Sequence, residues 1–481
     1  MKKIHDVRLN AVLNMIKQFC AVLFPLITVP YISRVLGADS YGKTNFSLSI
    51  VNYFIIFAGL GMQNYGTREG ARLRQNSHDF ELFASEVFTL NALSVLVSYI
   101  ALFVMLFCFD GLSEYHALIL VQSLAMVFTW LGADWVNSAF EDYTYITLRY
   151  IFAQVLSIIA MFMFVKDSAD YVIYALILTF AGYGVNLLNL FYIRKYVRIK
   201  FVFSKAIFRH LAPLLILLGN SLAVTVYINS GVTLLGVFRS DAEVGVYAVA
   251  TKVYSIVKQL LNAMLIVFVP RLSAMLGQNQ KEDYNRMLNT LLNVLLCLLL
   301  PAVVGMMMLS NEIVTLLSGP EFLEAGKSLI ILCISLGFAV FACFFSNCIL
   351  LPMKKDKMFL SATLVGCIVN IIVNFICIPI WGHIGAAVST VVAEAAVLTV
   401  CYFAGRQSVK LSVPIRSLVA TLIGCALIVV TTTLSKYLFS ALALQIGAGV
   451  ILSVAGYLAV HIILKNPLLL DFLKTLKNRS A

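Results

Sequence analysis

The sequence predicts an all-α polytopic membrane protein with about fourteen transmembrane helices. Of the 481 residues, 61% are hydrophobic and only 12% are charged, whereas soluble proteins carry about 25% charged residues. The hydrophobic residues are gathered into long runs, and a helix of about 20 residues spans the hydrocarbon core of a bilayer. The basic residues fall between these runs in an alternating pattern. These three observations indicate a chain that is solvated mainly by lipid.

The apolar runs define the predicted spans in order. The first run contains Lys17, Pro25 and Pro30 but no small-residue cleavage site, so we expect it to be an uncleaved span. No connection between runs is long enough to bury a core of its own, which excludes a soluble catalytic domain. The predicted spans cover residues 10–33, 44–62, 83–108, 115–136, 147–165, 171–193, 211–237, 244–269, 287–309, 326–351, 358–380, 384–404, 416–434 and 439–464.

The distribution of basic residues predicts that both termini are cytoplasmic. Most of the 35 Lys and Arg residues fall in connections on the side of the N-terminus, and such a bias marks the cytoplasmic side. The net charge of +12 is therefore a topology signal that anionic inner-leaflet lipids reinforce, and not a nucleic-acid-binding surface. The opposite side holds Arg34, Lys43, Lys166, Arg239, Lys327 and Lys436.

A weak internal repeat predicts two lobes. With an offset of 203 residues, Gly42 aligns with Gly245 and Arg68 aligns with Arg271. The repeat divides the chain into a six-helix lobe at 1–203, a second at 204–405, and helices thirteen and fourteen with a cytoplasmic tail at 406–481. Parallel repeats of this kind are related by an axis along the membrane normal, and the substrate site lies at their interface.

Three lysines lie inside apolar runs: Lys17, Lys252 and Lys258. An ammonium group at membrane depth costs about 2.5–3.5 kcal/mol on insertion scales unless it faces water or a partner. The three lysines therefore predict a wet, positively charged interior that suits an anion. Snorkelling to the interface and interhelical hydrogen bonding are the structural alternatives, strongest for Lys17.

Polar residues accompany these lysines at helical spacing. Lys252, Gln259 and Asn262 fall at i, i+7 and i+10 on one face of the eighth predicted span, and Asn262 also shares an adjoining stripe with Lys258. The first span repeats the theme with Asn14 and Lys17. We predict that these side chains contact the substrate.

Acidic residues inside the spans have several interpretations. Glu394 lies near mid-span, where it could bind H⁺ or Na⁺ for coupling or act as the counter-ion of a lysine; the sequence leaves both open. Glu86 and Asp134 lie near inner ends, where we expect interfacial solvation. The six histidines show no metal-ligand spacing and there is no phosphate-binding glycine loop. We therefore predict no catalytic residue, metal or organic cofactor.

Several motifs together resemble the polysaccharide-biosynthesis (Wzx-type O-antigen) flippase family. This family belongs to the multidrug/oligosaccharidyl-lipid/polysaccharide exporter (MOP) superfamily, with the MATE exporters and the lipid II flippase. The resemblance covers nearly the whole chain and adds Arg34 to the candidate substrate-binding residues. Its motifs are Pro30-Tyr-Ile-Ser-Arg34-Val-Leu-Gly37-Ala-Asp-Ser-Tyr41-Gly42, Arg68 with Ala71, Gly132-Ala-Asp134-Trp135 with Glu141 and Arg149, Glu243-Val-Gly245-Val-Tyr247, Pro270-Arg271-Leu-Ser273, Gly319-Pro-Glu-Phe, Asn370 with Asn374, and Gly385-Ala386-Ala387.

The resemblance implies a fold and a function. It implies two six-helix bundles in a V, in the bacterial cytoplasmic (inner) membrane. The implied cargo is an undecaprenyl-pyrophosphate-linked glycan, such as an O-antigen repeat unit of lipopolysaccharide, moved to the periplasmic leaflet by alternating access. Polymerase and chain-length components of the assembly machinery are implied partners. In the lipid II flippase, basic residues on spans one, two and eight contact the pyrophosphate, whereas here only spans one and eight carry mid-membrane cations.

Two other functions remain as alternatives. A MATE-type cation-coupled exporter of small molecules should have an acid-lined cavity, and the lysines argue against it. A membrane-embedded polysaccharide polymerase or glycosyltransferase usually needs a sizeable outer loop, which the predicted connections lack. We therefore expect a transporter and not an enzyme.

Overall fold

The computed structural model describes residues 7–466, without the side chains of residues 7–12 and of Asn14. Within this range the chain is helical and forms no strand. It divides into two compact units: unit 1 is Met1–Gly236 with Ser240–Gly245, and unit 2 is Val237–Arg239 with Val246–Ala481. This division differs from the lobe boundary expected at 203 and 204, because the helix at Leu211–Phe238 belongs almost entirely to unit 1.

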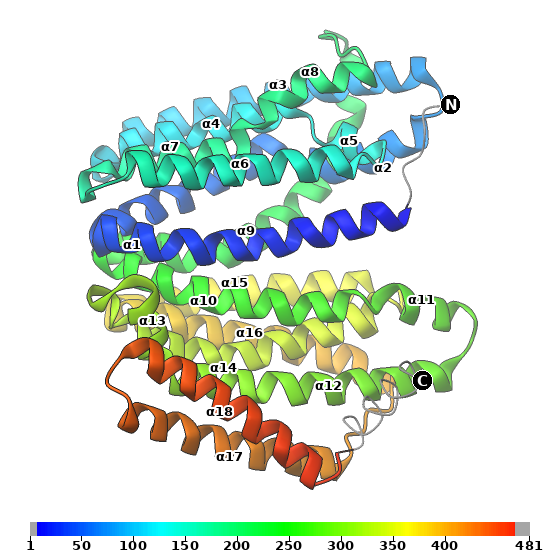
Figure 1. The fold of residues 1–481 in the computed structure, drawn as a ribbon. Helices are drawn as coiled ribbons and strands as arrows, with labels where there is room; N and C mark the ends of the chain where they lie inside the picture. The colour runs from blue at the N-terminus through cyan, green and yellow to red at the C-terminus, as the bar shows by residue number, and fades with distance from the viewer. Residues whose placement is uncertain (1–6, 467–481) are drawn as a thin grey trace. The chain divides into compact units, whose positions relative to one another are not determined.

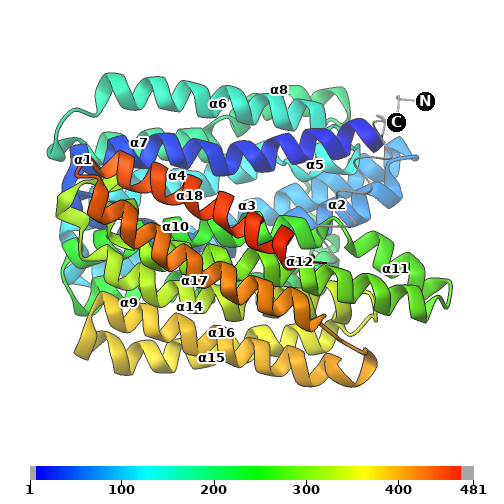
Figure 2. The ribbon, with the colours of Figure 1, turned by 60° about the horizontal axis from the view of Figure 1, so that its bottom comes forward.

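The helices of each unit are drawn in Figures 1 and 2, in chain order from blue to red. Unit 1 contains α1 (Val7–Gly59), α2 (Met62–Leu73), α3 (Ser77–Cys108), α4 (His116–Gly132), α5 (Trp135–Ala139), α6 (Tyr143–Phe164), α7 (Tyr171–Thr179), the π-helical turn η3 (Phe180–Gly184), α8 (Asn186–Tyr192), the 3₁₀ turn η5 (Lys205–His210) and α9 (Leu211–Phe238). Unit 2 contains α10 (Asp241–Ile266, its first residues in unit 1), α11 (Val269–Gly277), α12 (Lys281–Met308), α13 (Ser310–Ser318), α14 (Ala325–Cys343), the π-helical segment η7 (Phe344–Leu350), α15 (Asp356–Trp381), α16 (His383–Gly405), α17 (Ile415–Leu438) and α18 (Leu442–Ile463).

The described residues include thirteen helices that are long and apolar enough to cross a membrane. The first of them combines the first two predicted spans, because α1 has 53 residues. A straight helix of that length would measure about 80 Å, far more than the roughly 30 Å of a bilayer's hydrocarbon core. The non-helical backbone of Gly37, with φ 72° and ψ 175°, breaks α1 between the two spans. Only glycine adopts such a conformation at little cost.

Large apolar side chains cover the outside of both units. Phe107 is 89% exposed, Ile216 is 76% exposed and Ile463 is 74% exposed. In water such a surface would drive aggregation, whereas acyl chains solvate it at no cost. The prediction of an all-α polytopic membrane protein is thus confirmed.

The two glycines that the sequence repeat aligns meet in a close helix crossing inside unit 1. A Cβ atom on Gly42 would lie 1.8 Å from the backbone oxygen of Asp241, and one on Gly245 would lie 2.1 Å from the backbone oxygen of Ala38. The same offset of 203 residues relates Ala38 to Asp241. Each glycine therefore contacts the residue that is equivalent to the one its counterpart contacts. This reciprocal contact between equivalent positions supports the repeat.

Unit 2 is built from antiparallel hairpins. α15 and α16 pack along their length, and so do α17 and α18, which run side by side in orange and red in Figure 2. Gly382, with φ 55°, turns the chain between α15 and α16. A Cβ atom on Gly385 would lie 2.3 Å from the backbone oxygen of Cys377, so this glycine permits the close approach. The short predicted connection between these two spans is therefore confirmed.

Candidate functional site

Unit 1 contains a cavity of about 360 Å³ near the turns that join α1 to α2 and α4 to α5. This volume holds on the order of ten water molecules, enough for a diphosphate or one sugar ring but not for an oligosaccharide. The lining is rich in polar side chains: Lys17 of α1, Gln63 and Asn64 of α2, Asn91 of α3, Thr129 of α4, Asp134, Arg149 and Tyr150 around α5 and α6, and Asn186 of α8.

An ion pair forms one wall of this cavity. The Nη2 atom of Arg149 lies 2.6 and 2.7 Å from the two carboxylate oxygens of Asp134. The Arg149 side chain is only 5% exposed and that of Asp134 is 29% exposed. The buried Nη1 atom of Arg149 has no hydrogen-bond partner within residues 7–466. The guanidinium group therefore has hydrogen-bonding capacity left for a ligand.

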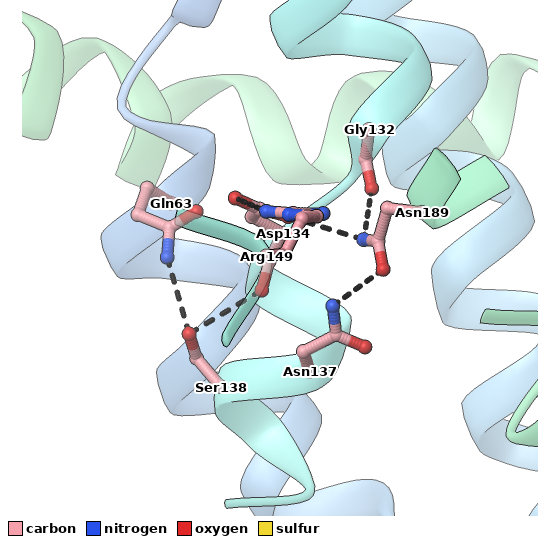
Figure 3. A network of polar contacts seen from close by, with 7 residues as sticks. All are labelled: Gln63, Gly132, Asp134, Asn137, Ser138, Arg149 and Asn189. Carbon is pink, nitrogen blue, oxygen red and sulfur yellow. Dashed lines mark hydrogen bonds and ion pairs between the residues drawn. The ribbon is translucent and has the colours of Figure 1, made fainter. Parts of the chain in front are cut away.

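A network of amides holds the ion pair in place (Figure 3). Asn189 donates to Asp134 Oδ1 at 3.1 Å and also to the backbone oxygen of Gly132. Asn137 in turn donates to Asn189 Oδ1 at 2.6 Å. Charged groups away from bulk water are stable only when such partners satisfy them. The network thus fixes the position of the Asp134 carboxylate.

Local backbone and packing place Asp134 at this wall. Ala133, with φ 42°, ends α4 in a left-handed conformation, so the chain turns before Asp134. The next residue, Trp135, packs edge-to-face on Phe83 with 5.7 Å between ring centroids. A Cβ atom on Gly66 would lie 2.5 Å from the Trp135 ring, so only glycine lets α2 approach it. Trp135 therefore anchors α5 between α2 and α3.

Lys17 lies in the same cavity as Arg149. Its side chain is half-buried, and its Nζ atom is 5.6 Å from the centroid of the Tyr150 ring. Two cationic groups thus line the cavity with one carboxylate, which leaves one positive charge in excess. This excess favours an anionic ligand.

Lys258 and Glu394 form an ion pair inside unit 2. Lys258 Nζ lies 2.6 Å from Glu394 Oε1, and the Tyr254 hydroxyl donates to the same oxygen at 3.4 Å. The Glu394 side chain is 5% exposed and that of Lys258 is 28% exposed. Of the two interpretations that the sequence left open for Glu394, this geometry favours the counter-ion. The charge of Lys258 is compensated by its own unit.

The other predicted residues lie apart from these two clusters. On α10, Lys252 and Gln259 are exposed, while Asn262 accepts a hydrogen bond from the Asn347 amide at 3.1 Å. Arg34 is exposed on α1, seventeen residues beyond Lys17 and roughly 25 Å from it along the helix, and it does not line the cavity. The Asn14 side chain lies outside the described residues.

The sequence interpretation missed Arg149 and was wrong about two acids. Arg149 was named only in a motif of the family resemblance, together with Asp134, and Asp134 was expected to be solvated at the interface, whereas the two residues pair with each other. Asp134 lies at the end of one predicted span and Arg149 at the start of the next, on the same side, and this is the signal that could have predicted the pair. Glu86 is 2% exposed and contacts Arg209 at 2.5 Å and His210 at 2.9 Å, so interfacial water does not solvate it.

Comparison with known proteins places the chain in a family. Residues 7–276 match the family model described as "Polysaccharide biosynthesis protein", over more than half of the chain. Residues 216–376 also match the MatE family model.

Three curated proteins are similar in sequence. The "Putative O-antigen transporter" of Escherichia coli K12 is 23% identical over 57% of this chain and 67% of that protein. The "Probable low-salt glycan biosynthesis flippase Agl15" of Haloferax volcanii is 26% identical over 37% of this chain and 38% of that protein. The "Succinoglycan biosynthesis transport protein ExoT" of Rhizobium meliloti is 24% identical over 65% of this chain and 62% of that protein. The chain thus spans less than two thirds of the length of the last two.

Solved transporter structures share the fold. The lipid II flippase MurJ, in an inward closed conformation, superposes with a TM-score of 0.78 at 18% identity, covering 96% of this chain and 99% of that chain. An inward-facing multidrug resistance MATE transporter of the MOP superfamily superposes with a TM-score of 0.61 at 16% identity, covering 82% and 97%. At these identities the likeness establishes the fold alone. The chain is therefore a multi-pass membrane protein of the polysaccharide biosynthesis protein family, with the fold of the MurJ and MATE transporters.

Proposed function

We propose that this protein is a flippase for an undecaprenyl-pyrophosphate-linked oligosaccharide, such as an O-antigen or similar surface-polysaccharide repeat unit. It would move this cargo by alternating access from the cytoplasmic to the periplasmic leaflet of a bacterial inner membrane. The observation that carries the proposal is the polar cavity of unit 1, where Lys17 and Arg149 face one carboxylate. The names of the related O-antigen, glycan and succinoglycan transporters support the same substrate class.

The cavity has the chemistry that a diphosphate needs. Lys17 would act as a point charge, and the unpartnered Nη1 atom of Arg149 would donate to a phosphate oxygen. The amides of Asn64 and Asn186 line the same space and can bond phosphate or sugar oxygens. Because the cavity is too small for an oligosaccharide, it would hold only the charged end of the cargo. The polyprenyl tail would stay in the bilayer.

Unit 2 would contribute contacts from α10. Lys252 and Gln259 are exposed there, and Lys252 has no ion-pair or hydrogen-bond partner among the described residues. Lys252 is therefore the proposed anion contact of this unit. Lys258 would act on the cargo only after its pairing with Glu394 changes.

Ion coupling at Glu394 is part of the proposal. Binding of H⁺ or Na⁺ by the Glu394 carboxylate would remove the charge that Lys258 neutralises, and so would free the ammonium group for the anionic cargo. Transport in proteoliposomes with and without H⁺ and Na⁺ gradients tests this coupling. Gradient-independent transport would eliminate it.

The alternative of a MATE-type exporter of small organic cations receives less support. The MatE match and the MATE-like fold are compatible with it. However, the excess positive charge in the cavity of unit 1 would repel a cationic substrate. An enzyme such as a polymerase or glycosyltransferase is disfavoured because no connection between the described spans forms a folded domain.

The proposal predicts that the charge of Lys17 is needed for export of the glycan. Loss of one charge-assisted contact, about 1.5–3 kcal/mol, should reduce surface glycan roughly tenfold or more in a Lys17→Ala strain. Lys17→Arg should retain most of it, because the charge remains. Surface glycan is measured in a deletion strain at matched protein levels, with Lys205→Ala as the exposed control. Normal glycan in the Lys17→Ala strain would exclude the proposed contact.

A further inference from the structure

A second cavity, of about 670 Å³, lies in unit 2 where α12 begins and the chain approaches α17. It lies in a different unit from the cavity that holds Lys17 and Arg149. Its lining includes the cationic side chains of Lys281, Arg286 and Lys410 and one acid, Glu282, and Arg286 Nη1 also lies 3.8 Å from the Asp283 carboxylate. Three cationic groups thus stand against two carboxylates, which leaves one positive charge in excess.

Three asparagines on α12, each one helical turn after the last, line this cavity: Asn285, Asn289 and Asn293. Asn285 and Asn289, one turn apart, hold the non-helical segment that precedes α17: the backbone N–H of Lys410 donates to Asn285 Oδ1 at 3.2 Å, and that of Ser412 donates to Asn289 Oδ1 at 2.8 Å. Asn289 also donates to the Lys410 backbone oxygen at 3.2 Å. The segment is therefore fixed in register on α12.

Among the described residues, the third asparagine in this series accepts no such hydrogen bond from the backbone. Asn293 follows Asn289 by one turn, and residue 414 follows Ser412 by two positions, so this register pairs Asn293 with residue 414. That residue is Pro414, which has no N–H group to donate. Asn293 is only 4% exposed, and its Oδ1 atom has no hydrogen-bond partner within residues 7–466. A buried acceptor that lines a cavity requires a donor from whatever fills it.

The depth of the cavity indicates a lipid headgroup. α12 has 28 residues and is about 42 Å long, whereas the hydrocarbon core is about 30 Å thick. The charged first two turns of α12, which line the cavity, therefore extend into the headgroup layer. Basic clusters at that depth attract anionic lipids. The sequence beyond Asn466 carries Lys474, Lys477 and Arg479 against Asp471, so its charge does not complement the cavity.

We propose that this cavity binds the headgroup of an anionic phospholipid that bears a hydroxyl group, of the phosphatidylglycerol class. The phosphate would accept hydrogen bonds from Lys281, Arg286 and Lys410, and a headgroup hydroxyl would donate to Asn293 Oδ1. With the cytoplasmic N-terminus that the distribution of basic residues predicts, this lipid would belong to the cytoplasmic leaflet. Lipid binding at this position would secure the hairpin of α17 and α18 to α12.

Lipid binding to the purified full-length protein tests the proposal. Thermal unfolding in detergent is followed with added phosphatidylglycerol, phosphatidylcholine, phosphatidylethanol and glycerol 3-phosphate, and bound lipid is counted by native mass spectrometry. We expect phosphatidylglycerol to raise the unfolding temperature most and to remain bound. Phosphatidylethanol, which has the charge but no headgroup hydroxyl, should act more weakly. Equal shifts with phosphatidylcholine would overturn the proposal, and equal shifts with glycerol 3-phosphate would reassign the site to a soluble phosphate ester.

Variants separate the charge from the hydroxyl acceptor. Arg286→Gln with Lys410→Gln should weaken phosphatidylglycerol binding about tenfold, whereas the control Lys205→Gln with Lys357→Gln, exposed residues with the same charge change, should not. Asn293→Val should abolish the preference for phosphatidylglycerol over phosphatidylethanol. Equal loss in the control pair, or an unchanged preference in Asn293→Val, would contradict the site. No glycan enters these measurements, so their failure is distinct from failure of the proposed transport function.

Discussion

At the scale of single residues, the cavity of unit 1 depends on one ion pair. Arg149 is almost fully buried, and one of its nitrogens contacts both oxygens of Asp134. A buried pair adds little net stability over an apolar replacement, but removal of one partner typically costs about 3–5 kcal/mol because the other charge is stranded. Here the partial exposure of Asp134 reduces that cost. The pair therefore keeps a cation in a fixed position.

A double-mutant cycle measures this pair. Asp134→Asn should destabilise the protein more than Arg149→Gln, because the former strands a guanidinium group that is only 5% exposed, whereas the carboxylate of Asp134 is 29% exposed. The double variant should be more stable than the sum of the single changes predicts, with a coupling of about 1–3 kcal/mol. Thermal unfolding of the four purified proteins in one detergent gives the coupling. Additive effects would show that the two charges do not interact.

A second residue-scale prediction concerns Asp142, which lies between α5 and α6. Burial raises its pKa, but hydrogen bonds from the hydroxyls of Tyr192 and Tyr196, each at 2.6 Å, and from the backbone of Tyr145 hold the pKa below its usual value. Because the pKa of Asp142 is lower in the folded protein, its carboxylate stabilises the fold at pH values above the pKa of an aspartate in the unfolded chain, about 3.9. That contribution is lost as the pH falls through the folded pKa.

Tyr192→Phe with Tyr196→Phe should therefore lower the stability at pH 7 by about 1–3 kcal/mol. The variant should also lose less stability than the parent when the pH falls from 5 to 3. Denaturation at the two pH values measures both effects, with Tyr437→Phe, at an 88% exposed position, as the control. An unchanged acid dependence in the variant would mean that the phenols do not stabilise the carboxylate.

The sequence predicts site residues well only where their environment is anomalous. Lys17 was identified because a lysine within an apolar run is costly. Arg149 has no such anomaly, since it lies at the start of a predicted span, where a charge is ordinary, and only the fold brings it to Asp134. The partner of Lys258 was likewise undetermined, because Glu394 is 136 residues away in the chain.

At the scale of elements, glycine determines where helices approach closely. The crossing of α1 with the start of α10 leaves no room for a side chain at Gly42 or Gly245. The sequence predicted these elements and their equivalence through the 203-residue offset. It did not predict that the equivalent glycines touch, because an alignment of repeats does not give the contacts between them.

Gly245→Ala tests the crossing. The new Cβ atom would lie 2.1 Å from the Ala38 backbone oxygen, so the two helices must separate, and overpacking of this kind costs about 1–3 kcal/mol. Gly337→Ala in α14 is the matched control, because no atom lies within 4 Å of its new Cβ and alanine favours a helix by about 1 kcal/mol over glycine. Thermal unfolding should show a loss for the first variant and none for the second. Equal stability in both variants would contradict the close crossing.

At the scale of the whole molecule, hydropathy and charge distribution predict most of the architecture. The spans follow from apolar runs, since each must cover the thickness of a bilayer. The two compact units do not follow the lobe boundary expected at 203 and 204, because α9 comes after that boundary and yet belongs with unit 1. Which unit a helix joins depends on packing, and the uniform apolar composition of lipid-facing helices does not encode it.

The most direct test of the central claim is transport in proteoliposomes. Purified protein is reconstituted with an undecaprenyl-pyrophosphate-linked oligosaccharide that carries a fluorescent label, and a membrane-impermeant quencher reports the leaflet that holds the label. We predict that the wild-type protein equalises the label between leaflets, that Lys17→Ala slows this at least tenfold, and that Lys205→Ala does not. If the wild-type protein leaves the labelled lipid in its original leaflet, under every ion gradient applied, then it is not a flippase for this cargo.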